Sequence, residues 1–148
     1  MDLKHFKTDA AKEQDGVWQP IGEGTEFLIA RMNNPACKAA FKKHAGRFKG
    51  PALDMLPAKK QDEIYAKVLA ETILIDWRET VGGKVRQHSV TLDGKKVAYS
   101  VEAATALLSD PDYSDLLSIV RIYAEDADAY REHAVEEAVG NSQAASGG

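Results

Sequence analysis

The chain has 148 residues, a formal net charge of −4 and one cysteine, Cys37. This length fits a single domain that buries roughly two-thirds of the surface of its unfolded chain, so neither a disulfide nor a metal ion is required for stability. One cysteine excludes an internal disulfide and a zinc-finger ligand set, and it is typical of a reducing, cytoplasmic setting.

The charge and hydropathy exclude further classes of protein. A dedicated nucleic-acid-binding protein is expected to carry a net basic face, whereas this chain is acidic overall. No apolar run reaches the roughly 18 residues that a membrane span needs. We therefore expect neither nucleic acid nor membrane as a partner.

The charged residues are unevenly distributed along the chain. Residues 27–53 contain no acidic residue but six basic ones, and residues 110–141 contain nine acidic residues against Arg121 and Arg131. The basic residues are Arg31, Lys38, Lys42, Lys43, Arg47 and Lys49. This pattern fits two solvated helix faces of opposite sign, or a polar assembly surface that orients a partner before docking.

The chain begins with a polar stretch, residues 1–16, which we expect to be a mobile N-terminal lead. Two β-prone runs then flank Gly22-Glu23-Gly24 and predict a hairpin over residues 17–31. Pro20 lacks a backbone N–H, so the first strand should lie at a sheet edge.

Two helices are predicted next. Asn34 can cap a helix that has Pro35 at its first position and stops at Gly50-Pro51. A longer helix begins near Pro57 and ends at Gly82-Gly83. Its apolar stripe consists of Ile64, Val68, Leu69, Ile73 and Trp77.

The C-terminal half repeats these signals. Asp93-Gly94 is a two-residue turn signal that predicts a second hairpin over residues 85–99. Ser100 caps a short helix over 101–108, and Asp110-Pro111 opens a last helix that runs to about residue 139. Residues 142–148 are small and polar, and we expect a disordered tail. The fold class is thus predicted to be mainly α (α+β), a single helical domain over residues 17–141 with one or two small β-hairpins.

Candidate catalytic chemistry is weak. Cys37 and His44 lie seven apart on one helix face, but two ligands do not make a metal site. A zincin motif needs two histidines four apart. We therefore predict no catalytic, cofactor-binding or metal-binding residue. Two alternatives stay open: a metal-dependent enzyme built on Glu132, His133 and Glu136, and a nucleic-acid module on Lys38, Lys42, Lys43 and Arg47.

Large aromatic residues are the best candidates for protein contacts. Anchors of this type dominate protein interfaces when a pocket of the partner receives them, although such residues more often pack in the core. The candidate protein-binding residues are Trp18, Phe27, Trp77 and Tyr99.

Several short motifs, in this order, resemble a tail assembly chaperone family of long-tailed phages and prophages. They are residues 18–31, Asn33-Asn34-Pro35, Ile75-Asp76-Trp77, Val97-Ala98-Tyr99-Ser100, residues 102–108, Asp110-Pro111, residues 119–130 and Gly140-Asn141. The polar excursion at residues 78–96 is longer than the compact turn expected in this family. The resemblance covers most of residues 17–141, and its specificity lies in the order of the motifs.

The resemblance implies a non-enzymatic role in tail morphogenesis. Such proteins bind the tape measure protein and help to recruit tail tube subunits in the host cytoplasm, and they are not retained in the mature virion. A homo-oligomer is also compatible with this role. The alternative is another virion morphogenesis component, such as a tail-completion or connector protein.

Overall fold

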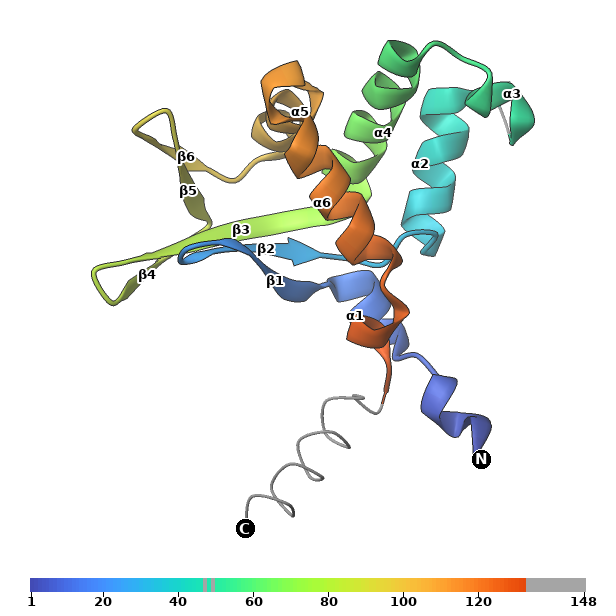
Figure 1. Ribbon diagram of the computed structural model, residues 1–148, viewed down its shortest axis with the longest axis horizontal. Helices are drawn as coiled ribbons and strands as arrows, with labels where there is room; N and C mark the ends of the chain where they lie inside the picture. Colours follow the sequence, from blue (N-terminus) through green and yellow to red (C-terminus); the bar gives the residue numbers. More distant parts are fainter. Residues whose placement is uncertain (47, 49, 133–148) are drawn as a thin grey trace.

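The computed structural model describes residues 1–46, 48 and 50–132 of the chain. Its centre is an antiparallel sheet with the strand order β1-β2-β3-β4, beside a separate two-stranded sheet, β5-β6 (Figure 1). The strands are β1 (Val17–Gly22), β2 (Thr25–Ile29), β3 (Leu74–Val81), β4 (Lys84–Gln87), β5 (Ser89–Leu92) and β6 (Lys95–Ala98). The expectation of a single helical domain with one or two small hairpins is therefore wrong, and the fold is an α+β mixture.

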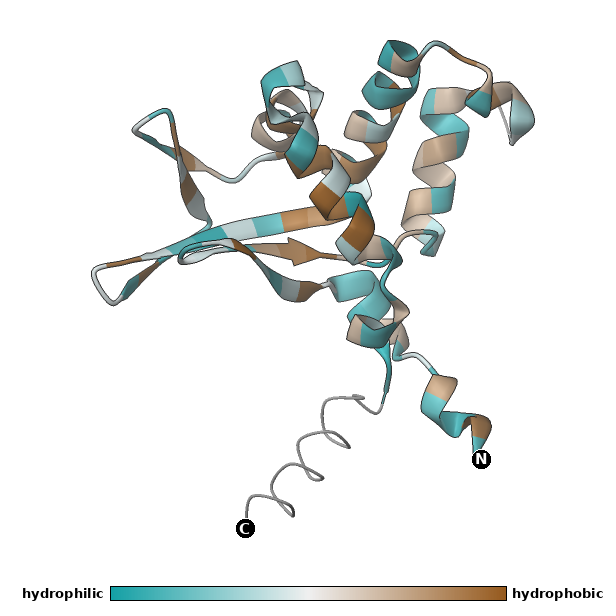
Figure 2. Ribbon diagram, in the orientation of Figure 1, coloured by the Kyte–Doolittle hydropathy of each residue, from teal (hydrophilic) through white to brown (hydrophobic). Residues whose placement is uncertain are grey.

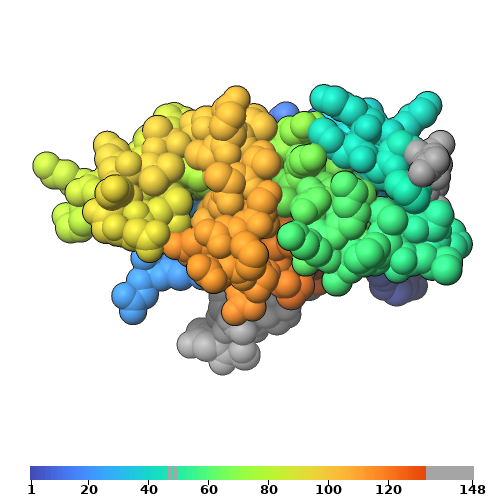
Figure 3. Space-filling view, turned by 90° about the horizontal axis from the view of Figure 1, so that it is seen from above, coloured from blue at the N-terminus to red at the C-terminus, as the bar shows by residue number. Residues whose placement is uncertain are grey.

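Four helices, α2, α4, α5 and α6, lie on one side of the four-stranded sheet (Figures 1 and 3). The α-helices are α1 (Ala10–Asp15), α2 (Pro35–Ala45), α3 (Pro51–Asp54), α4 (Ala58–Thr72), α5 (Val101–Ser109) and α6 (Ser114–Glu125). Three 3₁₀ helices, η1 (Leu3–Phe6), η2 (Pro111–Tyr113) and η3 (Ala127–Tyr130), complete the described part. No helix in this part is long and apolar enough to span a membrane.

The main error of the sequence analysis lies at the boundary between α4 and β3. The predicted helix over residues 57–81 ends at Thr72, and the chain continues as a strand that pairs with β2, Trp77 opposite Phe27. Residues 73–81 are rich in β-branched and aromatic residues, which suit a pleated, half-buried surface. The pairing of β2 with β3 shifts register between Leu28 and Ile29, which interrupts the alternation of inward and outward side chains in β3. Leu74 and Trp77 are therefore both buried, and their spacing of three residues is also typical of a helix.

Both predicted hairpins are present, the first as part of the four-stranded sheet and the second as the separate two-stranded sheet. β1 and β2 form the first hairpin, and the strand with Pro20 lies at the edge as expected. The second hairpin has its turn at Asp93-Gly94, but only residues 89–98 form it. Residues 84–87 instead form β4, which pairs antiparallel with β3. His88, with a φ of 60°, interrupts the extended backbone between β4 and β5.

The predicted caps are confirmed, although Asp110 caps a 3₁₀ turn that precedes α6. The end of α5 lies within one residue of its predicted position, whereas α2, α4 and α6 end earlier than predicted. The Asn34, Ser100 and Asp110 side chains each accept a hydrogen bond from a backbone N–H of the turn that follows. The last helix ends at Glu125, where a 3₁₀ turn follows, and not near residue 139. Residues 133–139 and the predicted tail at 142–148 lie outside the described residues.

The core fills the space between the helices and the inner face of the sheet. Apolar residues concentrate where α4 and α6 approach β2 and β3, and the outer part of β3 is more polar (Figure 2). Large side chains with no more than 2% relative exposure include Trp77, Tyr130, Ile29, Leu69, Ile73, Leu74 and Leu108. These residues come from helices and from strands, so the two layers form one core.

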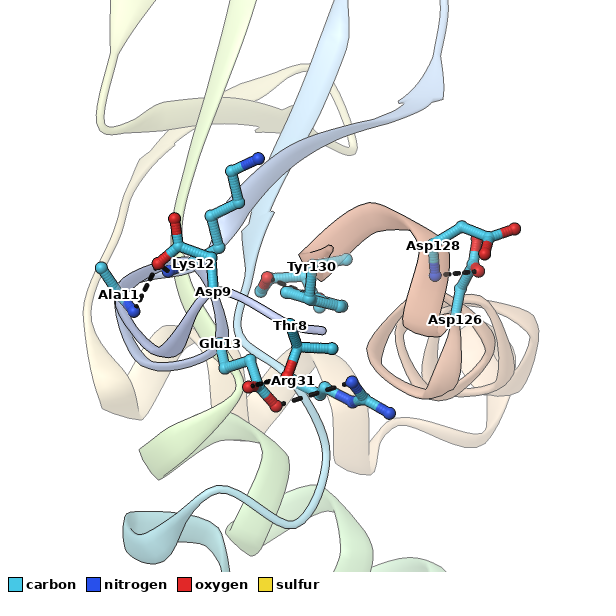
Figure 4. Close-up of polar contacts among 10 residues, drawn as sticks. Thr8, Asp9, Ala11, Lys12, Glu13, Arg31, Asp126, Asp128 and Tyr130 are labelled. Carbon is cyan, nitrogen blue, oxygen red and sulfur yellow. Dashed lines mark hydrogen bonds and ion pairs between the residues drawn. The ribbon is translucent and has the colours of Figure 1, made fainter. Parts of the chain in front are cut away.

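Within residues 1–16, which are predicted to be a mobile lead, Thr8 to Glu13 lie beside Tyr130 and the neighbouring end of the described chain (Figure 4). The Asp9 N–H donates to the Tyr130 carbonyl at 2.7 Å, and Thr8 forms a β-bridge with Arg131. The Glu13 carboxylate accepts from the Thr8 hydroxyl at 2.6 Å and lies 3.6 Å from the Arg31 guanidinium. These contacts join the two ends of the described chain.

Candidate protein-binding groove

A groove of about 440 Å³ lies along α2, where Leu53 of α3, Tyr65 of α4 and Glu125 of α6 complete its lining. We call it the α2–α4 groove. Its apolar lining consists of Met32, Phe41, Ala45, Phe48, Leu53 and Tyr65, and its charged lining consists of Lys38, Lys42 and Glu125. Sites that recognise a ligand are concave and mostly apolar with a few polar groups, and this groove has that character.

Helix α2 presents different faces to the core and to the groove. Cys37 and Ala40 are buried, and the Cys37 Sγ lies 3.8 Å from the Met32 Sδ. Burial raises the pKa of the Cys37 thiol. Phe41, one position further round the helix than Ala40, is only half-buried and lines the groove. The two-faced pattern of α2 therefore places one aromatic ring at the edge of the core.

The aromatic part of the groove is held in place by neighbouring rings and charges. The rings of Phe41 and Tyr65 pack edge to face with centroids 5.3 Å apart. The Arg121 guanidinium lies 4.1 Å from the centroid of the Tyr65 ring. Both geometries are favourable for aromatic rings. The rings are thus oriented before any partner binds.

The basic and acidic segments of the sequence meet at this groove. Lys38 and Lys42 are exposed on α2, and Glu125 is exposed at the end of α6. The structure thus brings residues from the acid-free stretch and from the acidic stretch to the rims of one concave surface.

A second pocket, of about 550 Å³, lies between α4 and the α5–α6 connection. Its lining includes Lys59, Asp62, Glu63, Ser109, Asp110 and Ser114 and contains no aromatic residue. Because aromatic anchors characterise protein interfaces, the α2–α4 groove is the stronger candidate.

Three of the four predicted protein-binding residues form one cluster away from the groove. Phe27 and Trp77 are buried, and the Trp77 Nε1–H donates to the Val97 carbonyl at 3.2 Å. Tyr99 packs edge to face on Trp77 and donates its hydroxyl to the Leu74 carbonyl at 2.5 Å. Burial, followed by the nearby Asp76 carboxylate, raises the pKa of Tyr99 to about 12. In this conformation Phe27 and Trp77 pack the core and reach no partner.

Trp18, the fourth residue, is half-buried on the sheet face opposite the helices. The Arg78 guanidinium lies 3.9 Å from its ring centroid and also 3.0 Å from the Glu26 carboxylate. None of the four predicted residues lines the α2–α4 groove. Phe41 and Phe48 were not among the predicted binding residues, because the spacing of apolar residues along a helix does not show which of them a neighbouring helix covers.

The candidate metal and acid–base residues have structural partners where the structure describes them. The His44 Nε2 lies 2.8 Å from the Glu71 carboxylate, far from a metal-like arrangement with Cys37. Among the described residues no group of three or more His, Cys, Asp or Glu side chains is placed to hold a metal ion. His133 and Glu136 lie outside the described residues, as does Arg47 of the basic helix.

A family comparison agrees with part of the resemblance. The YdaY prophage protein family matches residues 26–141, which include β2 except for Thr25, all of β3 and all helices that form the groove. No curated protein and no solved structure matches the chain. The match confirms the phage or prophage origin that the sequence motifs implied, without specifying a role in tail assembly. The chain belongs to the YdaY prophage protein family.

Proposed function

We propose that this prophage protein is a tail assembly chaperone. In this role it makes and breaks no covalent bond, binds the tape measure protein and helps to recruit tail tube subunits in the host cytoplasm. It is released before the virion is complete. The proposal joins the order of the sequence motifs with the family match.

The observation that carries the proposal is the α2–α4 groove. Its half-buried Phe41, Leu53 and Tyr65 pack against the core and leave part of their apolar surface accessible in the groove. An amphipathic helix recognises such a groove by inserting apolar side chains spaced three or four residues apart. A long, apolar tape measure protein needs such cover during tail assembly.

Co-expression with the tape measure protein of the same prophage tests the proposal. We expect the tape measure protein to stay soluble and to co-purify with the wild-type chain. Phe41→Asp should abolish both effects, because a carboxylate in the groove would be desolvated by the partner. Val101→Asp is the matched control, since Val101 is 42% exposed at the start of α5, outside the groove.

Two measurements make the result decisive. Circular dichroism and thermal unfolding should show that both variants remain folded. A tape measure protein that aggregates equally with and without the wild-type chain would contradict the proposal. Stoichiometric presence of the chain in purified virions would instead favour the alternative, a tail-completion or connector protein.

A further inference from the structure

We propose that the α2–α4 groove selects a partner helix by charge as well as by hydrophobicity. The occupant is an amphipathic helix of a partner protein with acidic residues on the flank that meets α2 and basic residues on the flank that meets Glu125. This inference deepens the proposed function and rests on it.

The positive rim has the geometry of a row. Lys38 and Lys42 are four residues apart in α2, so they lie one turn apart on the same face of the helix. Both side chains are exposed beside the groove, and neither forms an ion pair with another described residue. Acidic residues at positions i and i+4 of a parallel or antiparallel partner helix would match this row.

The negative rim comes from α6, which approaches the Tyr65 ring through Arg121, whereas α2 approaches the same ring through Phe41. Glu125 belongs to the last turn of α6, and it too has no ion-pair partner among the described residues. In contrast, His44, also on α2, is paired with Glu71 of α4. The charged side chains beside the groove are thus available to a partner. His44, which packs between α2 and α4, already has an acidic partner within the chain.

The opposite signs of the rims constrain how a helix can lie in the groove. The apolar face of the partner must point to the floor formed by Phe41 and Tyr65. Reversing the chain direction of the partner then exchanges its left and right flanks. A helix with one acidic and one basic flank is therefore accepted in one direction only, which gives the groove an orientation preference beyond burial of apolar area.

Three synthetic helical peptides test this inference with the full-length chain. They share one leucine stripe and differ in their flanks, which carry Glu and Lys, Lys and Lys, or Glu and Glu. Fluorescence anisotropy at low salt measures their affinities. We expect the Glu/Lys peptide to bind about tenfold more tightly than the Lys/Lys peptide. Several partly exposed charge pairs together contribute a free energy of this size. The Glu/Glu peptide should bind with intermediate affinity.

A charge-reversal variant and its control locate the effect. Lys38→Glu combined with Lys42→Glu makes both rims acidic, so the Lys/Lys peptide should become the tightest ligand. Lys59→Glu combined with Lys67→Glu changes the net charge equally at exposed positions of α4 outside the groove, and should leave the original order intact. Phe41→Asp should weaken all three peptides.

Several outcomes would overturn the inference. The net charge of −4 by itself favours the Lys/Lys peptide, so a preference for that peptide in the wild-type chain would contradict rim recognition. Equal affinities, no binding, or binding insensitive to Phe41→Asp would do the same, as would occupation of the groove by a second copy of the chain in sedimentation experiments.

If the tape measure protein co-purifies but the peptides show no preference, only this inference fails. If the preference holds but the tape measure protein does not bind, only the proposed function fails.

Discussion

Single buried side chains connect distant parts of this protein. Tyr130, at 0% exposure, donates its hydroxyl to the Ile29 carbonyl at 2.8 Å, across a sequence separation of 101 residues. Tyr123 makes a similar bond to the Pro20 carbonyl at 2.7 Å, but in an exposed position. The two tyrosines thus fasten the end of the described chain to β1 and β2, with different degrees of burial.

Tyr130→Phe should destabilise the fold by about 1–2 kcal/mol, because it removes a buried donor and leaves the Ile29 carbonyl with one partner fewer. Tyr123→Phe should cost less than about 0.5 kcal/mol, since water can replace an exposed hydroxyl. Urea unfolding monitored by tryptophan fluorescence measures both. Equal losses in the two variants would show that burial does not determine the cost.

The half-buried phenol of Tyr99 and the buried phenol of Tyr130 also predict how stability depends on pH. Burial raises the pKa of Tyr99 to about 12 and raises the pKa of Tyr130 as well, so the folded state favours the neutral phenols. The unfolded chain ionises near pH 10. Stability should therefore be fully present below pH 10 and fall as the pH rises from about 10 to 12.

Chemical denaturation at several alkaline pH values, with absorbance of the phenolates, measures this loss. Tyr99→Phe should flatten the alkaline slope. A wild-type slope that Tyr99→Phe leaves unchanged would assign the alkaline transition to other groups.

At the scale of elements, local signals located the beginnings of segments better than their ends. Asn34, Ser100 and the Asp93-Gly94 turn act through neighbours within three residues, so their roles are visible in the sequence. The end of α4 depends instead on β2, a distant segment whose backbone groups pair with residues 74–79. Where the spacing of apolar residues fits both a helix and a strand, pairing with a distant strand determines which of the two forms.

The turn between β5 and β6 yields a prediction with an internal control. Gly94 has a φ of +75° and open space around it, so Gly94→Ala should cost about 1–2 kcal/mol through backbone conformation alone. Gly22 also has open space but no positive φ, and Gly22→Ala should be neutral or slightly stabilising. Thermal unfolding of the two variants compares them directly, and a similar loss in both would mean that conformation is not the cause.

At the scale of the whole molecule, residues 7–12 form hydrogen bonds with the end of the described chain. The Lys7 carbonyl accepts from the Glu132 N–H at 2.9 Å, and the Lys12 ammonium donates to the Arg131 carbonyl at 3.2 Å (Figure 4 shows the neighbouring contacts). The mobility of residues 1–16 stays a prediction from their polar composition. No sequence pattern indicates that this segment makes hydrogen bonds to a distant part of the chain.

Deleting residues 1–9 should therefore lower the free energy of unfolding by about 2–4 kcal/mol, the loss of several backbone hydrogen bonds at about 0.5–1.5 kcal/mol each. Deleting only residues 1–5 should have little effect, because these residues are exposed and the bonds to Tyr130 and Glu132 remain. Urea unfolding measures both. If the longer deletion is as stable as the full chain, these hydrogen bonds contribute nothing to the free energy of unfolding.

The sequence by itself determined the helix caps, the two hairpin turns, the edge position of Pro20 and the two oppositely charged segments. Each of these depends on residues close together in the chain or on a simple count of charges. Only the tertiary structure decided that residues 74–81 form a strand and that Phe27 and Trp77 belong to the core. It also decided that Lys38, Lys42 and Glu125 border one groove. Those outcomes depend on which distant surfaces meet, because burial and strand pairing are properties of the assembled layers and not of any single segment.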